Sequence, residues 1–399
     1  MRTASIVASI LDELGFGLKM GRQVMSADYV MGKPNQEETA AHYQWALENG
    51  AKKEYIEPFK EGYTGIVATM DTKKEGPTIA FRVDMDALPI HESEEDSHFP
   101  QKEGFSSSVP NTMHACGHDA HTAIGLGLAS LIAEHKESLK GKIKLIFQPA
   151  EEGTRGARSM AEAGVVDDVD YLIASHVGTG VPDGQFVASK NGFLATSKLD
   201  VTFKGVSSHA GGNPEEGKNA LLAAASAALN IYAIPRHSEG ATRINVGELH
   251  AGSGRNIIAD KAVLKIETRG ETTKINEYVK AQAEAVIAGS AQMYGVVYEI
   301  QTVGEAISAQ GSKELASVLH SCAQEADYLK ESILEDGSPA GSEDATFFIE
   351  RVQQSGGQAT YCIFGTELAA GHHNEKFDIK EDTMLNAVKL LFEALKKLH

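Results

Sequence analysis

The sequence is poor in cysteine, and its few cysteines follow no regular spacing. The chain of 399 residues contains only Cys116, Cys322 and Cys362. An odd and sparse set of cysteines excludes a disulfide framework and favours a reducing compartment, so we expect a cytoplasmic protein. No apolar stretch reaches the ~18 residues of a membrane-spanning helix. The apolar run from Ile6 is interrupted by Asp12 and Glu13, so no signal peptide is predicted.

Positive charge is also scarce. Lysine and arginine together number 37 against 55 aspartates and glutamates, which gives a formal net charge of −18. Nucleic acids and anionic membrane surfaces require basic patches on their partners, so we exclude both as the main partner. A small anionic substrate is compatible with this charge, because its binding needs only one or two local arginines.

The hydrophobic pattern predicts an α/β fold. Residues 1–30 and 36–50 have helical spacing, and short apolar runs then alternate with helical stretches. The expected strands are 78–84, 142–148, 171–176 and 360–365, and the expected helices are 118–135, 155–163 and 381–398. The strands are almost continuously apolar, which is typical of central strands covered on both faces. Their alternation with helices predicts a mostly parallel sheet.

The pattern changes in the middle of the chain. The order there is strand 199–205, helix 218–233, strands 243–253 and 262–270, helix 273–294 and strand 296–302. This βαββαβ order is that of the ferredoxin-like unit. We therefore predict an inserted domain at 197–308, between the two parts of a first domain at 1–196 and 309–399.

Side chains that bind metals cluster after the expected strands. The stretch MHACGHDAH, residues 113–121, contains three histidines, one cysteine and one aspartate. The other candidates are Asp84 and Asp86, Glu151 and Glu152, His176, and the pair His372 and His373. Each group alone has an ordinary structural explanation, such as a solvated glutamate pair or a buried cysteine. Because ligands collect beyond the carboxyl ends of strands in open α/β sheets, their shared placement favours a metal site.

The ligand types predict two adjacent divalent ions. The ligands would be Cys116, His118, His176, His373 and one of Glu151 and Glu152. Five protein ligands are too many for one tetrahedral zinc with an open position, and they suit a two-metal centre. The other glutamate can then act as general base. Asp86 would orient a ligand histidine. Zn²⁺ and Mn²⁺ both fit these ligands.

These residues resemble peptidase family M20 in its amidohydrolase branch, which includes aminoacylases, hippurate hydrolases and auxin-conjugate hydrolases. The matching segments are RVDMDALP, MHACGHDAH, FQPAEEG, SHVG, SSHAGG and HHNEKFD. The resemblance implies a metallopeptidase catalytic domain with a two-metal site. It also implies that the inserted domain is a lid and dimerisation domain, which pairs with a second copy or with a homologous chain.

The resemblance also implies individual roles. Glu152 takes the position of a metal ligand, and Glu151 takes that of the general base. The expected reaction is cleavage of N-acyl or N-aroyl amino acids, such as p-aminobenzoyl-glutamate, by a metal-bound hydroxide. His373 is preferred to His372 as a ligand because family members usually have an aromatic residue four positions after the ligand, and Phe377 has this spacing from His373.

The resemblance has one departure near Asp84. Other branches of the family have a His-x-Asp motif where this chain has Asp84-Met85-Asp86. We therefore leave Asp84 out of the ligand set. We keep Asp86 as a catalytic residue that orients a ligand histidine and does not itself bind the metal.

Three residues of the inserted domain also match family positions. His209 in SSHAGG is expected to stabilise the oxyanion of the tetrahedral intermediate. Asn256 and Arg269 are expected to contact the substrate. All three also have a structural explanation, since each lies in a loop or at a strand end.

Other functions remain open on the sequence alone. A thiol hydrolase would use Cys116 as nucleophile with His114 or His121 as base, and it would survive chelation. A non-catalytic or regulatory chain of a hetero-oligomeric hydrolase would be inactive when purified alone. A dipeptidase of the same family would differ only in its substrate.

Overall fold

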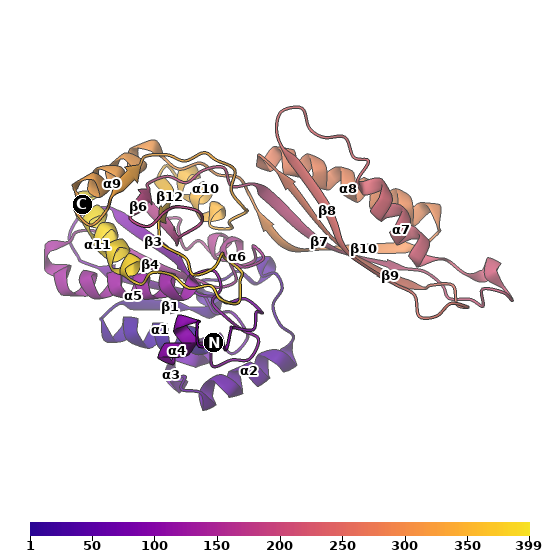
Figure 1. Cartoon of the computed structure of the whole chain (residues 1–399), viewed down its shortest axis with the longest axis horizontal. Coiled ribbons are helices and arrows are strands. Elements are labelled where there is room, and N and C mark those ends of the chain that lie inside the picture. Colours follow the sequence, from indigo (N-terminus) through magenta and orange to yellow (C-terminus); the bar gives the residue numbers. More distant parts are fainter. The chain divides into compact units, whose positions relative to one another are not determined.

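The computed structural model describes residues 1–399, which fold into two compact units (Figure 1). The first unit comprises Met1–Gly192, Ala309–Ser338 and Asp344–His399. The second comprises Phe193–Ser308 and Pro339–Glu343. The second unit thus begins at Phe193, whereas its start was predicted at residue 197. It also includes Pro339–Glu343, a segment for which the sequence predicted no element.

An eight-stranded sheet forms the centre of the first unit, in the order β1-β2-β4-β3-β5-β12-β6-β11. Its strands are β1 (Gly17–Met20), β2 (Ile66–Asp71), β3 (Thr78–Asp84), β4 (Lys142–Gln148), β5 (Tyr171–Val177), β6 (Gln185–Val187), β11 (Glu331–Ile333) and β12 (Gln358–Phe364). Strands β4, β3, β5 and β12 run parallel, whereas β1 and β2 join antiparallel at one end. The predicted mostly parallel sheet is confirmed, and the carboxyl ends of its four central strands share one edge.

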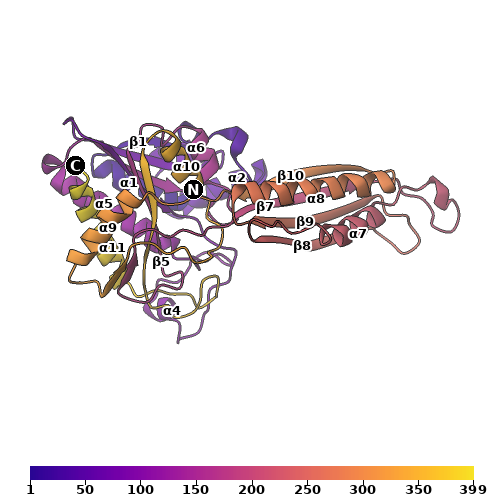
Figure 2. The ribbon, with the colours of Figure 1, turned by 90° about the horizontal axis from the view of Figure 1, so that it is seen from above.

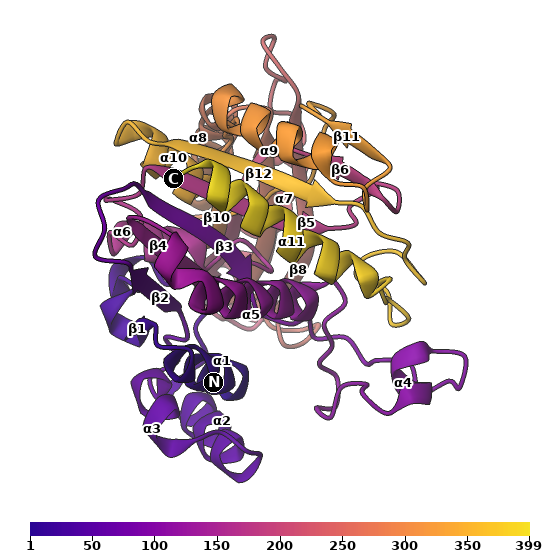
Figure 3. The same ribbon diagram turned by 90° about the vertical axis from the view of Figure 1, so that its left-hand side faces the viewer.

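Helices cover both faces of this sheet. Figure 3 shows α5 (His118–His135), α9 (Lys313–Glu325) and α11 (Asp382–Lys397) in front of it, with α6 (Ala157–Glu162) and α10 (Thr346–Gln354) behind. The remaining helices are α1 (Arg2–Glu13), α2 (Gln36–Glu48), α3 (Lys53–Ile56) and α4 (Phe99–Glu103). Helix α5 lies close to the sheet because Gly125 has no side chain, and a Cβ there would be 2.9 Å from Phe147. None of the helices combines the length and apolar character needed to cross a membrane.

The expected helix over residues 1–30 is wrong beyond residue 13. Helix α1 ends at Glu13, and Gly15 then adopts a left-handed φ of +82°. Only glycine tolerates this conformation easily, so the chain turns sharply there. Strand β1 follows and pairs antiparallel with β2. Strand β2 and helices α9 and α10 lie in stretches for which the sequence predicted no element.

The second unit is a four-stranded antiparallel sheet with two helices (Figure 2). Its elements are β7 (Ala195–Lys204), α7 (Ala220–Ile231), β8 (Thr242–Ala251), β9 (Lys261–Gly270), α8 (Thr273–Met293) and β10 (Val297–Ala306). The strand order β10-β7-β9-β8 and the βαββαβ succession confirm the predicted ferredoxin-like unit. Both helices pack on β9 and on each other. Small alanines such as Ala223 and Ala227 are fully buried on α7 and allow this close packing.

Candidate metal centre

A tight turn brings the motif of residues 113–121 to the edge of the sheet. Gly117 precedes α5 with φ +85°, and a Cβ at this position would lie 2.8 Å from the side chain of Val177. Glycine is therefore required both for the backbone conformation and for the close approach to β5. As a result, Cys116 and His118 lie beside His176, which belongs to β5.

The structure gathers all six metal-centre residues expected from the sequence. They are Cys116, His118, Glu151, Glu152, His176 and His373. They form three overlapping triads, and the ligand atoms within each triad lie within 4.8 Å of one another. The triads are Cys116–His118–His176, Cys116–Glu152–His373 and His118–Glu151–Glu152. Side chains from separate segments of the chain thus converge on one small volume.

Unpartnered buried atoms at this place fit divalent cations. The Nε2 atom of His118 and the Oε1 atom of Glu152 are buried and have no hydrogen-bond partner. Glu152 Oε1 does lie 3.3 Å from His373 Nε2, though without the geometry of a hydrogen bond. Leaving buried polar atoms unsatisfied costs about 1–3 kcal/mol each, which a cation between them would offset.

The tautomers of two histidines also suit metal binding. The Nδ1 atom of His118 lies 3.2 Å from the Asp86 carboxylate, and the Nδ1–H of His176 donates to the Val177 carbonyl at 2.7 Å. In each ring the Nδ1–H thus has an oxygen partner, so Nε2 is the atom that can bind a metal ion once the ring is neutral. The Nε2 atom of His176 faces the Cys116 sulfur at 3.6 Å.

Asp86 organises the glutamate pair as well as His118. Its carboxylate accepts the backbone N–H groups of Glu151 at 3.1 Å and Glu152 at 2.9 Å. The turn that carries the glutamates has unusual backbone conformations, because Ala150 and Thr154 both have positive φ values of 57° and 60°. Such strain persists only where surrounding contacts impose it, and it is frequent at functional sites.

Asp84 has other partners, which agrees with its omission from the expected ligands. Its carboxylate contacts the guanidinium of Arg82 at 2.8 Å and Nδ1 of His121 at 2.5 Å. Burial alone would raise the pKa of Asp84, but His118, His121 and Arg82 together hold that pKa well below its usual value. Arg82 also contacts Gln148 and Asp344. Sequence reasoning missed this buried network.

The two adjacent histidines His372 and His373 occupy different positions. His373 has φ +64°, and its Nε2 atom approaches Glu152. The Nε2 atom of His372 instead accepts the backbone N–H of Thr179 at 3.0 Å, while its Nδ1 atom lies 3.5 Å from the Cys116 sulfur. Burial, followed by the nearby His121 and His373, lowers the pKa of His372 to about 4. This geometry favours His373 as the ligand.

The Cys116 thiol is held in its protonated form in the absence of a cation. Burial is the main cause that raises its pKa to about 12, and the carboxylates of Glu152 and Glu151 add to it. A metal ion binds the thiolate, so occupation of the centre must release this proton.

Comparison with known proteins identifies the family. The sequence model of peptidase family M20/M25/M40 matches residues 80–397. The chain belongs to this family. It is 53% identical over 390 residues to an indole-3-acetyl-aspartic acid hydrolase of Enterobacter agglomerans, covering 98% of this chain and 89% of the relative. Identity to one of the subunits of p-aminobenzoyl-glutamate hydrolase from Escherichia coli is 51%, again covering 98% of this chain and 89% of the relative.

A solved structure agrees with this assignment. The crystal structure of an aminobenzoyl-glutamate utilization protein from Klebsiella pneumoniae superposes with a TM-score of 0.86 at 46% identity. The match covers 99% of this chain and 90% of that one. The predicted class, a metal-dependent amidohydrolase of the M20/M25/M40 family, is therefore confirmed.

Three residues of the second unit were expected to act at the active site. They lie in two neighbouring loops and near the end of a strand. His209 is exposed and pairs through its backbone with Ile257, and the Ala210 N–H donates to the Asn256 carbonyl at 3.0 Å. Arg269 on β9 is paired with Glu267 at 3.0 Å. His209 and Asn256 thus lie close together within their unit, and the roles of all three residues remain predictions.

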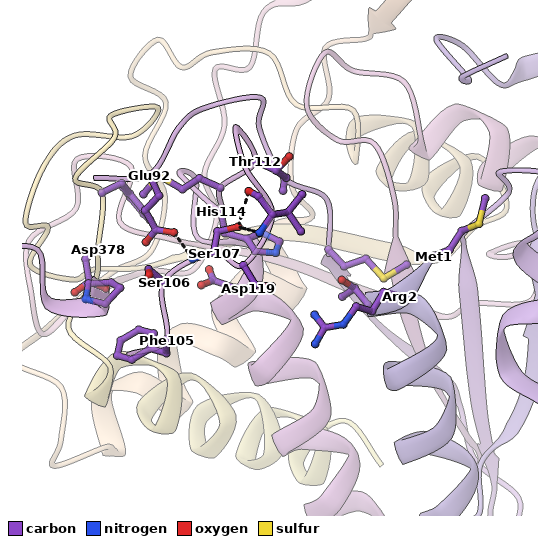
Figure 4. Close-up of a pocket in the computed structure, with 18 of the residues that line it drawn as sticks. Met1, Arg2, Glu92, Phe105, Ser106, Ser107, Thr112, His114, Asp119 and Asp378 are labelled. Carbon is purple, nitrogen blue, oxygen red and sulfur yellow. Dashed lines mark hydrogen bonds between the residues drawn. The ribbon is translucent and has the colours of Figure 1, made fainter. Parts of the chain in front are cut away.

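Residues of the first unit line two hollows that differ in their distance from the candidate metal ligands. One, of about 990 Å³, is lined by Asp86 and Glu152 and also by Lys33 and Arg155. The other, of about 620 Å³, is lined by His114, Asp119 and Glu92 but by none of the expected ligands (Figure 4). Only the first hollow is therefore lined by an expected metal ligand.

Proposed function

We propose that the protein hydrolyses the amide bond of N-acyl or N-aroyl derivatives of acidic amino acids, with p-aminobenzoyl-glutamate as the first substrate to test. The observation that carries this proposal is the convergence of sulfur, imidazole and carboxylate ligands around buried atoms that have no partner. Two of the similar proteins are named as hydrolases of an acyl-aspartate and an aroyl-glutamate, which supports the choice of substrate.

Two divalent ions would be held by Cys116, His118, Glu152, His176 and His373. Either Zn²⁺ or Mn²⁺ suits this mixture of soft, borderline and hard ligands. When bound, such ions polarise the scissile carbonyl and make water more acidic near neutral pH. The overlap of the triads at Cys116 and His118 supports two neighbouring ions rather than one.

Glu151 is the proposed general base. Its carboxylate is half-buried and lies 4.0 Å from the Nε2 atom of His118, at the edge of the ligand group. In this role Glu151 accepts the proton of the attacking water and then donates it to the departing amine. Asp86 holds the backbone of Glu151 in place, and His209 is the proposed oxyanion donor.

The hollow beside Glu152 offers a cationic site for a substrate carboxylate. Arg155 lines it, and its Nε atom is buried without a hydrogen-bond partner. The guanidinium group fits between Gly32 and Gly153, where an added Cβ would come within 2.7 Å of the arginine side chain. Lys33 lines the same hollow. We propose that Arg155 binds the side-chain carboxylate of an acidic amino acid.

The protein is also proposed to pair with another chain through its second unit. Strand β8 is an edge strand, so one side of its backbone is unpaired within this chain. Helix α7 lies beside β8 and exposes several apolar side chains, including Leu222 and Leu229. One similar protein is named as a subunit of its hydrolase, which makes a homologous partner chain an alternative to a second copy.

The test is the activity of the purified single chain before and after metal exchange. We expect p-aminobenzoyl-glutamate to be cleaved after loading with Zn²⁺ or Mn²⁺, with activity lost on chelation and restored by the metal. A thiol hydrolase would instead keep its activity in chelator and lose it with iodoacetamide. A non-catalytic chain would remain inactive with every acyl-glutamate, acyl-aspartate and dipeptide tested.

A further inference from the structure

His372 has a role that differs from that of its neighbour His373. Its ring lies between two aromatic neighbours, with centroids 5.5 Å from His176 and 5.0 Å from Phe377. Phe377 is only 4% exposed and is therefore fixed in place, so the His372 ring packed against it cannot turn freely. Both ring nitrogens have a neighbour, namely the Thr179 backbone on one side and the Cys116 sulfur on the other.

The backbone of residues 178–179 fixes the tautomer of His372. The Thr179 N–H donates to Nε2 at 3.0 Å, so Nε2 must carry a lone pair and the single ring proton must be on Nδ1. Gly178 has φ +77° and Thr179 has φ +47°, a conformation that a threonine rarely adopts. A Cβ at Gly178 would lie 3.0 Å from Nε2 of His372. This strained turn therefore holds an N–H group against the imidazole.

The protonated side of the ring faces a metal-binding sulfur. The Nδ1 atom of His372 lies 3.5 Å from Sγ of Cys116, within range for an N–H···S hydrogen bond. A nitrogen that carries a proton has no lone pair for a metal ion. We propose that His372 is not a ligand but a positioning residue, which donates a hydrogen bond from Nδ1–H to the Cys116 sulfur and so orients that sulfur for metal binding.

The hydrogen bond has two physical effects on the sulfur. It withdraws electron density from the thiolate, and such bonds tune the electronic properties of metal–sulfur sites. It also fixes the direction in which the sulfur presents its remaining lone pairs, which favours binding at one place. This inference rests on the metal centre proposed above, but it concerns a residue that the centre does not need as a ligand.

The first experiment uses the protein loaded with Co²⁺, whose sulfur-to-metal charge-transfer band reports on the thiolate. We expect His372→Phe to shift this band to longer wavelength and to weaken Co²⁺ binding about 10–100-fold, the usual effect of losing such a partner. His372→Asn keeps an N–H near the Nδ1 position and should restore both properties. At saturating Co²⁺, the bound metal per chain should equal that of the wild type in both variants.

Two outcomes of this experiment contradict the proposal. An unchanged band in His372→Phe would show that no hydrogen bond reaches the sulfur. Loss of a metal equivalent at saturation in that variant would show that His372 is a ligand. His373→Phe is the matched control, and it should lose bound metal because His373 is the expected ligand.

A second measurement needs no variant and no metal. In wild-type protein labelled with ¹⁵N-histidine, two-bond proton–nitrogen correlations distinguish the two neutral tautomers of each ring. We expect His372, assigned through its covalent neighbours, to carry its proton on Nδ1. A proton on Nε2 overturns the proposal. If the wild type binds no metal, the metal centre fails, whereas this measurement still decides the tautomer of His372.

Discussion

At the scale of single residues, the histidines around the metal centre are distinguished by which ring nitrogen is already engaged. His118 and His176 use Nδ1 for contacts with protein oxygens, which leaves Nε2 for a cation. His121 and His372 use Nε2 to accept backbone N–H groups, which leaves no lone pair on the protonated Nδ1. Four histidines with similar surroundings therefore divide into two groups, only one of which can bind metal.

The roles of the paired glutamates can be separated by matched substitutions. We expect Glu151→Gln to lower kcat by about 10²–10⁴-fold, because glutamine cannot accept the proton of the attacking water. Its metal content, measured by elemental analysis, should stay near that of the wild type. Glu152→Gln should instead lower the metal content, because it removes a carboxylate ligand. Normal turnover by Glu151→Gln would show that another group is the base.

The proposed role of Arg155 can be tested by comparing substrates with and without a side-chain carboxylate. We expect Arg155→Met to raise KM for acyl-glutamate about 10–100-fold, the equivalent of one lost charge-assisted hydrogen bond of about 1.5–3 kcal/mol. The KM for the corresponding acyl-glutamine should change little, because that substrate lacks the side-chain carboxylate. Equal losses with both substrates would indicate that Arg155 binds the α-carboxylate instead.

Arg158 provides the matched control for this prediction. It belongs to the same segment but stacks on Tyr29 at 4.8 Å and does not line the hollow beside Glu152. Arg158→Met removes the same charge from the segment. Its KM for acyl-glutamate should therefore stay within a few-fold of the wild-type value.

At the scale of elements, a buried carboxylate ties the start of helix α6 to strand β4 of the sheet. Asp344 accepts the N–H groups of Gly156 and Ala157, both at 2.9 Å, and the side-chain amide of Gln148 at 2.7 Å. Asp344 also lies 3.5 Å from the fully buried Arg82. The segment that begins at Gly156, just after the turn with the glutamate pair, is thus held by a residue far along the chain.

We expect Asp344→Asn to lower the free energy of unfolding by about 1–3 kcal/mol, because the amide nitrogen that replaces one buried carboxylate oxygen cannot accept the hydrogen bonds made there. Chemical denaturation measures this loss. Asp167→Asn is the control, since Asp167 pairs with Arg351 at 2.8 Å on the surface and should cost less than about 1 kcal/mol. A similar small loss in both variants would mean that the buried network contributes little to stability.

Much of the architecture was predictable, because the signals are local. The apolar runs identified β3, β4, β5 and β12, and the position of polar groups after them predicted the residues that the structure brings together as the candidate metal centre. Strand β1 was not predictable, because four residues after Gly15 carry no strand pattern distinct from the preceding helix. Asp344 was missed because its partners lie about two hundred residues or more away in sequence. The tautomer of His372 depends on the backbone of Thr179, which no sequence pattern reveals.

At the scale of the whole molecule, the second unit leaves an apolar surface on α7 beside the open edge of β8. Leu229 is 77% exposed and Leu222 is 44% exposed, and they lie seven residues apart on one side of the helix. Exposed apolar patches of this kind beside an unpaired strand edge mark interaction sites in proteins. A two-fold contact would cover the helices and strand edges of both chains together.

We expect the double variant Leu222→Glu/Leu229→Glu to be a monomer at micromolar concentration, because a two-fold contact would bring the new charges together in an apolar interface. Light scattering coupled to size exclusion measures the mass, and the wild type should have the mass of two chains. Leu385→Glu on α11 is the control, because Leu385 is 56% exposed in the first unit and should not affect the mass. A wild-type chain that is monomeric alone and pairs only with a homologous chain would identify the heterodimer, whereas a double variant that stays dimeric would place the contact elsewhere.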